Sequence, residues 1–106
     1  MSKLKVIQLL PELNIGGVER GTKDFSSALV QRGYESIVIS NGGIFENDII
    51  KDGARHIKVP IHKKSLFSLL LSKKLRSIYE VEKPDIVHVR SRMPALINFY
   101  AFKRLI

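Results

Sequence analysis

Apolar residues along the chain alternate between two kinds of spacing. Short, almost continuous apolar runs occur at 6–10, 35–40, 56–61 and 85–89. Runs of this length suit buried strands and are too short for ordinary helices. Helices are predicted between and after them, over 17–31, 45–51, 66–82 and 95–106. In the first and third of these, apolar residues recur at helical spacing.

Helix-terminating residues support these boundaries. Gly33 is the expected C-terminal cap of the first helix, Gly53 ends the second, and Pro84 stops the third. Helical spacing places the core side of the first helix at Val18, Gly21, Thr22, Phe25, Ala28 and Leu29. It places that of the third at Phe67, Leu70, Leu71, Leu75, Ile78 and Val81.

The order of elements predicts the fold class. Strands and helices alternate with short connections, which favours an α/β domain with a parallel sheet and helices on both faces. The segment 85–89 is the best candidate for a central strand. The turns at 16–17, 41–43 and 90–92 then share the carboxyl edge of the sheet, where open α/β sheets bind ligands. The final helix, 95–106, has too many apolar residues for one amphipathic face and needs further cover.

The glycine pair at 16–17 is the clearest functional signal. Gly16 and Gly17 lie between a strand and a helix, where free backbone N–H groups and the helix dipole favour an anion. The pair does not complete a dinucleotide fingerprint, since the strand at 35–40 ends in Ser40 with Asn41 following. Thr22 and Lys23 stand in the reverse of the P-loop order. An anion subsite within a larger site and a purely structural tight turn both remain open, and the first is favoured.

Other candidate residues flank the same edge. Glu19 is either a helix cap or a ligand contact, and Arg20 is disfavoured by the helix dipole, which slightly favours a ligand or ion-pair role for it. Arg90 and Arg92 can bind an anion bidentately or can be solvated. The remaining candidates are Asn41 and Gly42 in the second turn and His88, for which a hydrogen-bonded core position is favoured over a ligand contact. His56 and His62 are expected on the surface.

The amino-acid composition indicates which classes of binding partner are favoured. The net charge of +8 favours anionic ones, such as nucleotide sugars, acidic glycans, phospholipid surfaces or nucleic acid. Nucleic acid is the weakest of these, because no aromatic residues interleave with the basic cluster at 63–76. There is no cysteine and no pair with metal-ligand spacing, so we expect no metal site. No apolar run approaches the roughly 18 residues that cross a bilayer, and the N-terminus suits a core strand better than a signal peptide.

Four segments in order resemble a known family. KVIQLLPELNIGGVERG, ALVQRGYESIVIS, GARHIKVPIHKKS and EKPDIVHVRSR together are similar to the N-terminal half of family 4 glycosyltransferases. These are retaining enzymes of the GT-B architecture, with two Rossmann-like domains facing across a cleft, and they often act on lipopolysaccharide, exopolysaccharide or glycolipid. The resemblance implies an acceptor-side domain whose Gly16 and Gly17 approach the diphosphate or sugar of a nucleotide-sugar donor. It implies no cofactor and no cation.

The resemblance also sets expectations for the whole chain. Residues 1–106 are expected to be a truncated Rossmann-like acceptor-side domain without the C-terminal nucleotide-sugar domain, and to be inactive alone. The alternative is a non-catalytic anion-binding module that pairs with a separately encoded C-terminal half. The expected location is the cytoplasm, with peripheral contact to the anionic inner face of the cell membrane.

Overall fold

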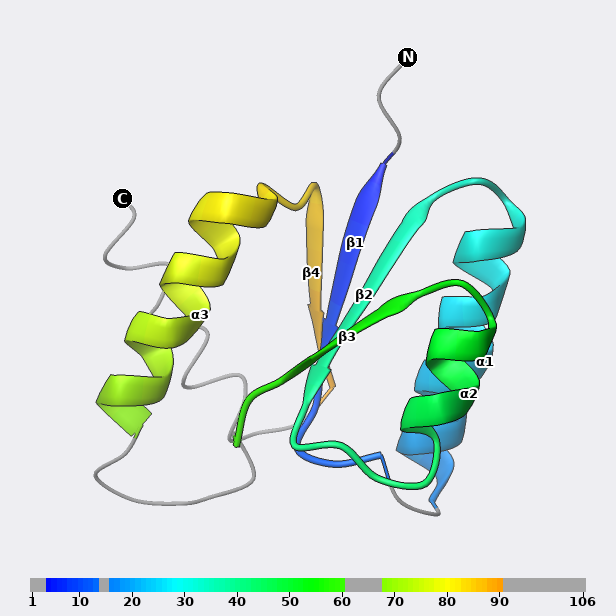
Figure 1. Cartoon of the computed structure of the whole chain (residues 1–106), viewed down its shortest axis with the longest axis horizontal. Coiled ribbons are helices and arrows are strands. Elements are labelled where there is room, and N and C mark those ends of the chain that lie inside the picture. Colours follow the sequence, from blue (N-terminus) through cyan, green and yellow to red (C-terminus); the bar gives the residue numbers. More distant parts are fainter. Residues whose placement is uncertain (1–3, 14–15, 61–67, 91–106) are drawn as a thin grey trace.

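The computed structural model describes residues 4–13, 16–60 and 68–90. Its elements follow the predicted order (Figure 1): β1 (Lys5–Leu9), α1 (Gly17–Gln31), β2 (Glu35–Ser40), α2 (Glu46–Lys51), β3 (Arg55–Lys58), α3 (Ser68–Glu82) and β4 (Ile86–Val89). The strand predicted at 56–61 begins and ends earlier than expected. The predicted helix 95–106 and the first residues of the helix predicted at 66–82 lie outside the described residues.

The strands form one parallel sheet in the order β3-β2-β1-β4. β1 lies between its two neighbours, with Ile7 opposite Ile37 of β2 and Val87 of β4. This arrangement confirms the predicted Rossmann-like fold class. Within the sheet formed by the described residues, β4 lies at an edge and its Ile86 is exposed, so the central position expected for 85–89 is not found there.

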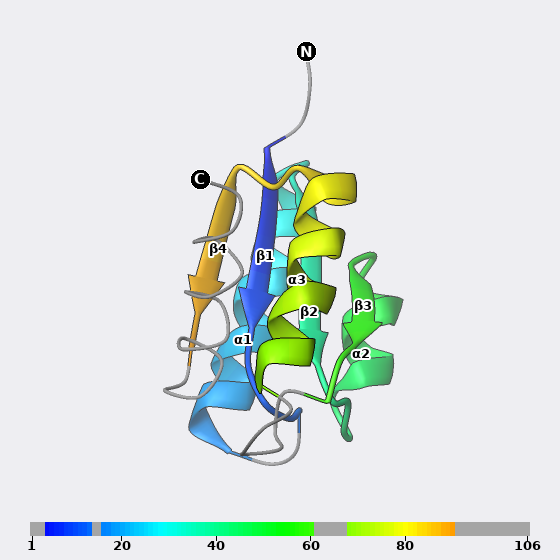
Figure 2. The ribbon, with the colours of Figure 1, turned by 90° about the vertical axis from the view of Figure 1, so that its left-hand side faces the viewer.

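Helices cover both faces of the sheet, as predicted. Figure 1 shows α1 and α2 on one side and α3 on the other, and Figure 2 shows α3 in front of the sheet. Successive strand residues point to opposite faces, so each face has its own apolar core. One core joins β1, β2 and α3 around Ile7, Ile37, Leu71, Leu75 and Tyr79. The other joins the loop after β1 to β2 and α2 around Leu10, Leu13, Val38 and Ile49.

The buried side of α1 differs from the predicted apolar stripe. Thr22, Ser26 and Leu29 are buried, whereas Val18, Phe25 and Ala28 are exposed. Small side chains let the helix approach the sheet closely, and the Ser26 and Ser36 hydroxyl oxygens lie 2.7 Å apart in a buried hydrogen bond. The prediction placed Thr22 and Leu29 on this face correctly and missed Ser26, because a small polar residue gives no hydrophobic signal.

α1 ends as the sequence predicts. Gly33 has φ 83°, a left-handed conformation that favours glycine. The amides of Gly33 and Tyr34 donate to the carbonyls of Val30 and Leu29, respectively. This pair of bonds is the Schellman motif, and it turns the chain directly into β2.

α3 confirms part of its predicted stripe. Leu71 and Leu75 are buried, and Ile78 packs against the same core. The prediction for Val81 is wrong, because 79% of this residue is exposed. Tyr79 takes the buried position instead, and burial raises the pKa of its hydroxyl.

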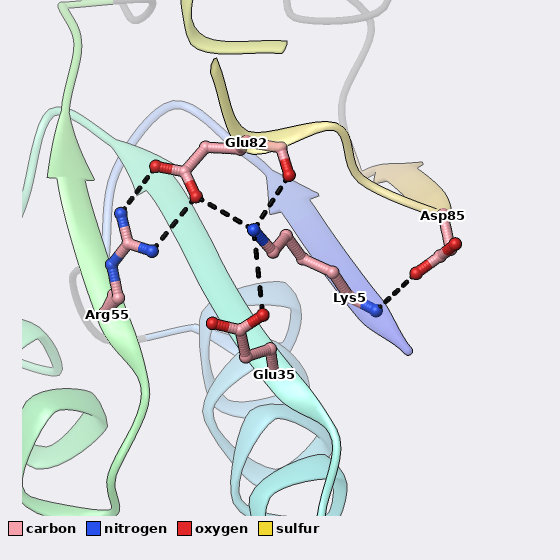
Figure 3. Close-up of polar contacts among 5 residues, drawn as sticks. All are labelled: Lys5, Glu35, Arg55, Glu82 and Asp85. Carbon is pink, nitrogen blue, oxygen red and sulfur yellow. Dashed lines mark hydrogen bonds and ion pairs between the residues drawn. The ribbon is translucent and has the colours of Figure 1, made fainter. Parts of the chain in front are cut away.

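An ion-pair cluster lies at the amino end of the sheet, where the strands begin (Figure 3). The Glu82 carboxylate at the end of α3 accepts two hydrogen bonds from Arg55, at 3.0 and 2.6 Å, and one from Lys5 Nζ at 3.2 Å. Lys5 Nζ also lies 3.6 Å from a Glu35 carboxylate oxygen, and the Lys5 amide donates to Asp85 at 2.7 Å. The cluster therefore ties β1, β3 and the end of α3 together, with β2 at its rim.

The crossover through α3 creates the feature that positions the site. β1, β2 and β3 follow one another in one direction across the sheet, and α3 then carries the chain over the opposite face to β4, beside β1. Such a reversal of strand order is a topological switch point, and ligands of open α/β sheets bind outside the carboxyl ends of the strands that flank it. Here those strands are β1 and β4.

Candidate functional site

The turn after β1 lies at this switch point. Gly16 immediately precedes α1, and Gly17 is its first residue, so the unpaired N–H groups of the first helical turn lie at the carboxyl end of the sheet. A Cβ added to Gly17 would meet no atom of the described residues within 4 Å. Packing among those residues therefore does not require a glycine at position 17.

The Glu19 carboxylate folds back over the start of α1. Its Oε2 would lie 2.6 Å from a Cβ placed on Gly16. A carboxylate is favourable there because it faces the positive end of the helix dipole. Among the described residues no side-chain hydrogen bond caps this helix start, so the cap role considered for Glu19 stays a prediction. Arg20, one residue further, is exposed to solvent.

The turn at 41–43 pairs through its backbone with the loop after β1. The Leu13 amide donates to the Gly42 carbonyl at 2.9 Å, and the Asn41 amide donates to the Pro11 carbonyl at 2.8 Å. Gly42 has φ 97°, which a residue with a side chain rarely adopts. The loops after β1 and β2 thus form one backbone-paired unit at the carboxyl end, which includes the candidates Asn41 and Gly42.

A buried polar chain fixes this second turn. The Gly42 amide donates to Ser40 Oγ at 3.0 Å, Ser40 Oγ lies 2.7 Å from His56 Nε2, and His56 Nδ1 lies 3.0 Å from Glu46 Oε1. Every group is satisfied when Ser40 donates to Nε2 and the protonated Nδ1 donates to Glu46. The order of groups is that of a serine–histidine–acid triad. Because Ser40 is fully buried, its hydroxyl cannot reach a substrate, and the chain supports the turn instead.

His56 corrects another prediction. Only 3% of its side chain is exposed, whereas a surface position was expected. Burial lowers the pKa of the imidazole, while Glu46 partly opposes that shift. His88 is the converse case, because it is exposed rather than part of the core, with its ring edge-on to Phe25 at 6.3 Å between centroids.

Arg90 directly follows β4, so it lies on the β4 side of the switch point, whereas the glycine turn lies on the β1 side. Its backbone amide donates to the Leu9 carbonyl at 2.9 Å, and its Nε donates to the Gln8 Oε1 at 2.8 Å. The guanidinium carbon lies 5.8 Å from the centre of the Phe25 ring. One terminal nitrogen, Nη1, would lie 3.9 Å from a Cβ on Gly21, which is one helical turn from Gly17.

The charge of Arg90 is not neutralised by the described part of the chain. No carboxylate among residues 4–13, 16–60 and 68–90 forms an ion pair with it. Burial lowers the pKa of its guanidinium, the direction expected for a cation that has lost water without gaining an opposite charge. Arg90 therefore presents a positive charge, with its terminal N–H groups not bonded to described residues, beside the start of α1.

The structure thus brings most of the sequence candidates to one end of the sheet. Gly16, Gly17, Glu19 and Arg20 lie at the start of α1, Asn41 and Gly42 lie in the neighbouring turn, and Arg90 lies opposite α1. Arg92 lies outside the described residues. Within the described ranges, no three potential metal ligands lie close enough to hold an ion, and no helix is long and apolar enough to cross a membrane.

Sequence reasoning missed the support around Arg90. Gln8 is fully buried, as is Thr22, whose carbonyl accepts a hydrogen bond from Gln8 Nε2 at 3.2 Å. The signal for Gln8 was present, since it is a polar interruption in an otherwise apolar strand, and buried polar groups need partners. Beside these residues, Leu4, Val6, Phe25, Ile86 and His88 help to line an open apolar cavity of about 480 Å³.

Comparisons with known proteins show which family this chain is similar to. The model of Glycosyltransferase Family 4 matches residues 15–106. A solved structure, the crystal structure of a glycosyltransferase from Rickettsia africae ESF-5, is similar over 98% of this chain, with 35% sequence identity and a TM-score of 0.84. This chain spans 28% of the length of that protein. A search of curated proteins finds no significant match. On the family match and the structural similarity together, the chain belongs to glycosyltransferase family 4.

Proposed function

We propose that this chain is the acceptor-side lobe of a retaining GT-B glycosyltransferase that uses a nucleotide-sugar donor. The carboxyl end of the sheet receives the donor's diphosphate and the sugar to be transferred. The observation that carries this proposal is the position of Gly17 and Arg90 on the two sides of the switch point. Backbone N–H groups at a helix start and a guanidinium are both suited to phosphate oxygens.

In this proposal the lobe supplies only part of the catalytic environment. Sugar transfer from a nucleotide needs preorganised positive charge around the departing diphosphate, in a site that excludes water. Arg90 and the start of α1 contribute one side of that environment. A second lobe, in the same or another polypeptide, holds the nucleotide and the remaining groups, which agrees with the 28% coverage of the solved glycosyltransferase. Residues 1–106 alone should therefore bind donor weakly and transfer no sugar.

The proposed acceptor is a glycan or lipid of cell-envelope polysaccharide synthesis. The net charge of +8 supports attraction to acidic glycans and to an anionic membrane surface at the cytoplasmic face. Asn41, in the turn after β2, and exposed Arg20 are the proposed acceptor or anion contacts. Gly42 belongs to the same turn but is buried, with its amide bound to Ser40 and its carbonyl to Leu13, so its proposed role is to shape the turn.

Gly17→Ala tests the donor role of the glycine turn. The added methyl group meets no atom of the described residues, so the free energy of unfolding should stay within about 0.5 kcal/mol of the wild-type value or rise. If the donor approaches this backbone closely, the same methyl group should weaken binding of UDP- and GDP-sugars by about tenfold, measured by NMR titration.

The matched control is Val18→Ala, at the next and exposed position of α1. It should leave both stability and donor binding close to wild type. Equal donor affinity for Gly17→Ala and wild type would contradict the proposed contact. Sugar transfer by residues 1–106 alone, in the presence of lipid or glycan acceptors, would contradict the division into two lobes.

A further inference from the structure

Gln8 is a polar residue in a buried part of the sheet, where apolar side chains are usual. It lies within β1 and is fully buried. Burying an amide without hydrogen-bond partners destabilises a fold, so both ends of this side chain must be satisfied. They are: Oε1 accepts from Arg90 Nε at 2.8 Å, and Nε2 donates to the Thr22 carbonyl at 3.2 Å.

The chemistry of the two partners fixes the orientation of the amide. An arginine Nε–H can only donate and a carbonyl can only accept, so Oε1 must face Arg90 and Nε2 must face Thr22. Gln8 therefore joins β1, α1 and the residue after β4 through a single side chain. A flipped amide would lose both hydrogen bonds, which makes this a single, defined arrangement.

These contacts constrain the guanidinium but leave its binding groups available. Gln8 takes only the Nε–H, and Phe25 lies against the guanidinium at 5.8 Å. No described carboxylate pairs with the terminal nitrogens. A long, flexible arginine normally loses rotamer freedom when it binds an anion, and a side chain already held in place loses less.

We propose that Gln8 is a positioning residue that holds Arg90 in the orientation required to bind the diphosphate of the donor. This inference rests on the proposed function for the identity of the anion. Gln8 touches no ligand itself and acts through Arg90, while its second bond, to Thr22, keeps Arg90 in register with the start of α1. Gln8 should therefore affect anion affinity even though it is buried.

The test uses Gln8→Met, which keeps the side-chain length and removes both hydrogen-bonding ends. Two quantities are measured on the full chain: the rate at which the Arg90 Nε–H exchanges with water, by NMR, and the dissociation constant for inorganic pyrophosphate. In the wild type the Arg90 Nε–H should exchange far more slowly than that of exposed Arg20. Gln8→Met should speed its exchange and raise the dissociation constant, each by about tenfold.

Ser26→Ala is the matched control. It removes another buried polar contact between α1 and the sheet, the Ser26–Ser36 hydrogen bond, without touching Arg90. It should destabilise the fold while leaving Nε–H exchange and pyrophosphate affinity unchanged. If Ser26→Ala weakens pyrophosphate binding as much as Gln8→Met does, the effect of Gln8 is general destabilisation and the inference is wrong.

The outcomes separate this inference from the proposed function. Fast exchange of the Arg90 Nε–H in the wild type overturns the positioning role, whether or not Gln8→Met folds. Unchanged pyrophosphate affinity in folded Gln8→Met, together with a loss in Arg90→Met, overturns the role of Gln8 and keeps that of Arg90. Unchanged affinity in Arg90→Met overturns the anion contact of the proposed function itself.

Discussion

Arg55 and Arg90 lie at opposite ends of the same sheet and have opposite surroundings. Arg55, at the amino end, is bound by both oxygens of Glu82, which raises the pKa of its guanidinium and lowers that of the Glu82 carboxyl. Arg90, at the carboxyl end, is bound by a neutral amide and has its pKa lowered by burial. The charges at the amino end satisfy one another, whereas Arg90 at the carboxyl end forms no ion pair with any described residue.

This difference separates stability from binding. At the amino end, Lys5, Arg55 and Glu82 hold strands and helix together with no group in need of a ligand. At the carboxyl end, the buried polar contacts of Gln8 and His56 hold loops in place around backbone N–H groups and a cation. Substitutions at the first end should therefore change the unfolding free energy alone, and those at the second should also change anion binding.

The largest effect on stability is expected for Glu82→Ala. It leaves Lys5 and Arg55 without their shared carboxylate, and Glu82 is 12% exposed whereas Arg55 is 52% exposed. After allowance for that solvent exposure, the free energy of unfolding should fall by about 2 kcal/mol. Chemical denaturation measures it, with exposed Glu80→Ala as the control, and pyrophosphate affinity should not change. A loss of affinity would show that the two ends are not independent.

The contribution of Glu82 should also depend on pH. Its folded pKa is lowered, chiefly by the hydrogen bonds from Arg55, so its contribution is complete above the unfolded pKa of about 4.5. As pH falls below that value, the unfolded state binds a proton first, and the contribution is lost through the folded pKa. The stability difference between wild type and Glu82→Ala should therefore shrink from pH 6 to pH 2. A constant difference over this range would argue against a role of the charge.

His56→Gln is expected to have a smaller effect, about 1 to 2 kcal/mol at pH 7, because it disturbs the contacts to Ser40 and Glu46. The pKa of His56 is lowered by burial, so the unfolded state binds a proton more readily. Wild-type stability should then fall as pH drops below about 6.5, and His56→Gln should lose that dependence. The control is His88→Gln, at an exposed position, which should retain it. Denaturation curves between pH 5 and pH 8 measure this dependence. An equal dependence on pH in the wild type and His56→Gln would contradict the prediction.

The smallest effect is expected for Glu35→Gln. Its carboxylate lies 3.6 Å from Lys5 Nζ and is 45% exposed, so water already screens the pair. The unfolding free energy should change by less than about 0.5 kcal/mol. A loss as large as that of Glu82→Ala would mean that the amino end acts as one cooperative network rather than around Glu82.

The sequence predicted the elements and their topology better than the contacts between them. Short apolar runs and Gly33 identify strands and a helix end from local residues alone, and alternation then implies a parallel sheet. The face of α1 was predicted only in part: Thr22 and Leu29 were placed on it, but Ser26 was missed because it is small and polar and its bond to Ser36 spans two elements. Gln8 and Arg90 are 82 positions apart, so only the pairing of β1 with β4 brings them together. His56 was expected on the surface and is buried, whereas His88 was expected in the core and is exposed. These predictions failed for the same reason, because burial depends on how distant elements pair.

The most direct test of the account is a backbone-amide NMR titration of the chain with inorganic pyrophosphate. Binding at the switch point predicts that the largest shift changes occur at Gly16, Gly17 and Arg90, with Lys5 and Arg55 unaffected. Larger changes at the amino end, or changes spread over the exposed lysines of α3, would contradict the claim that the carboxyl end is the anion site.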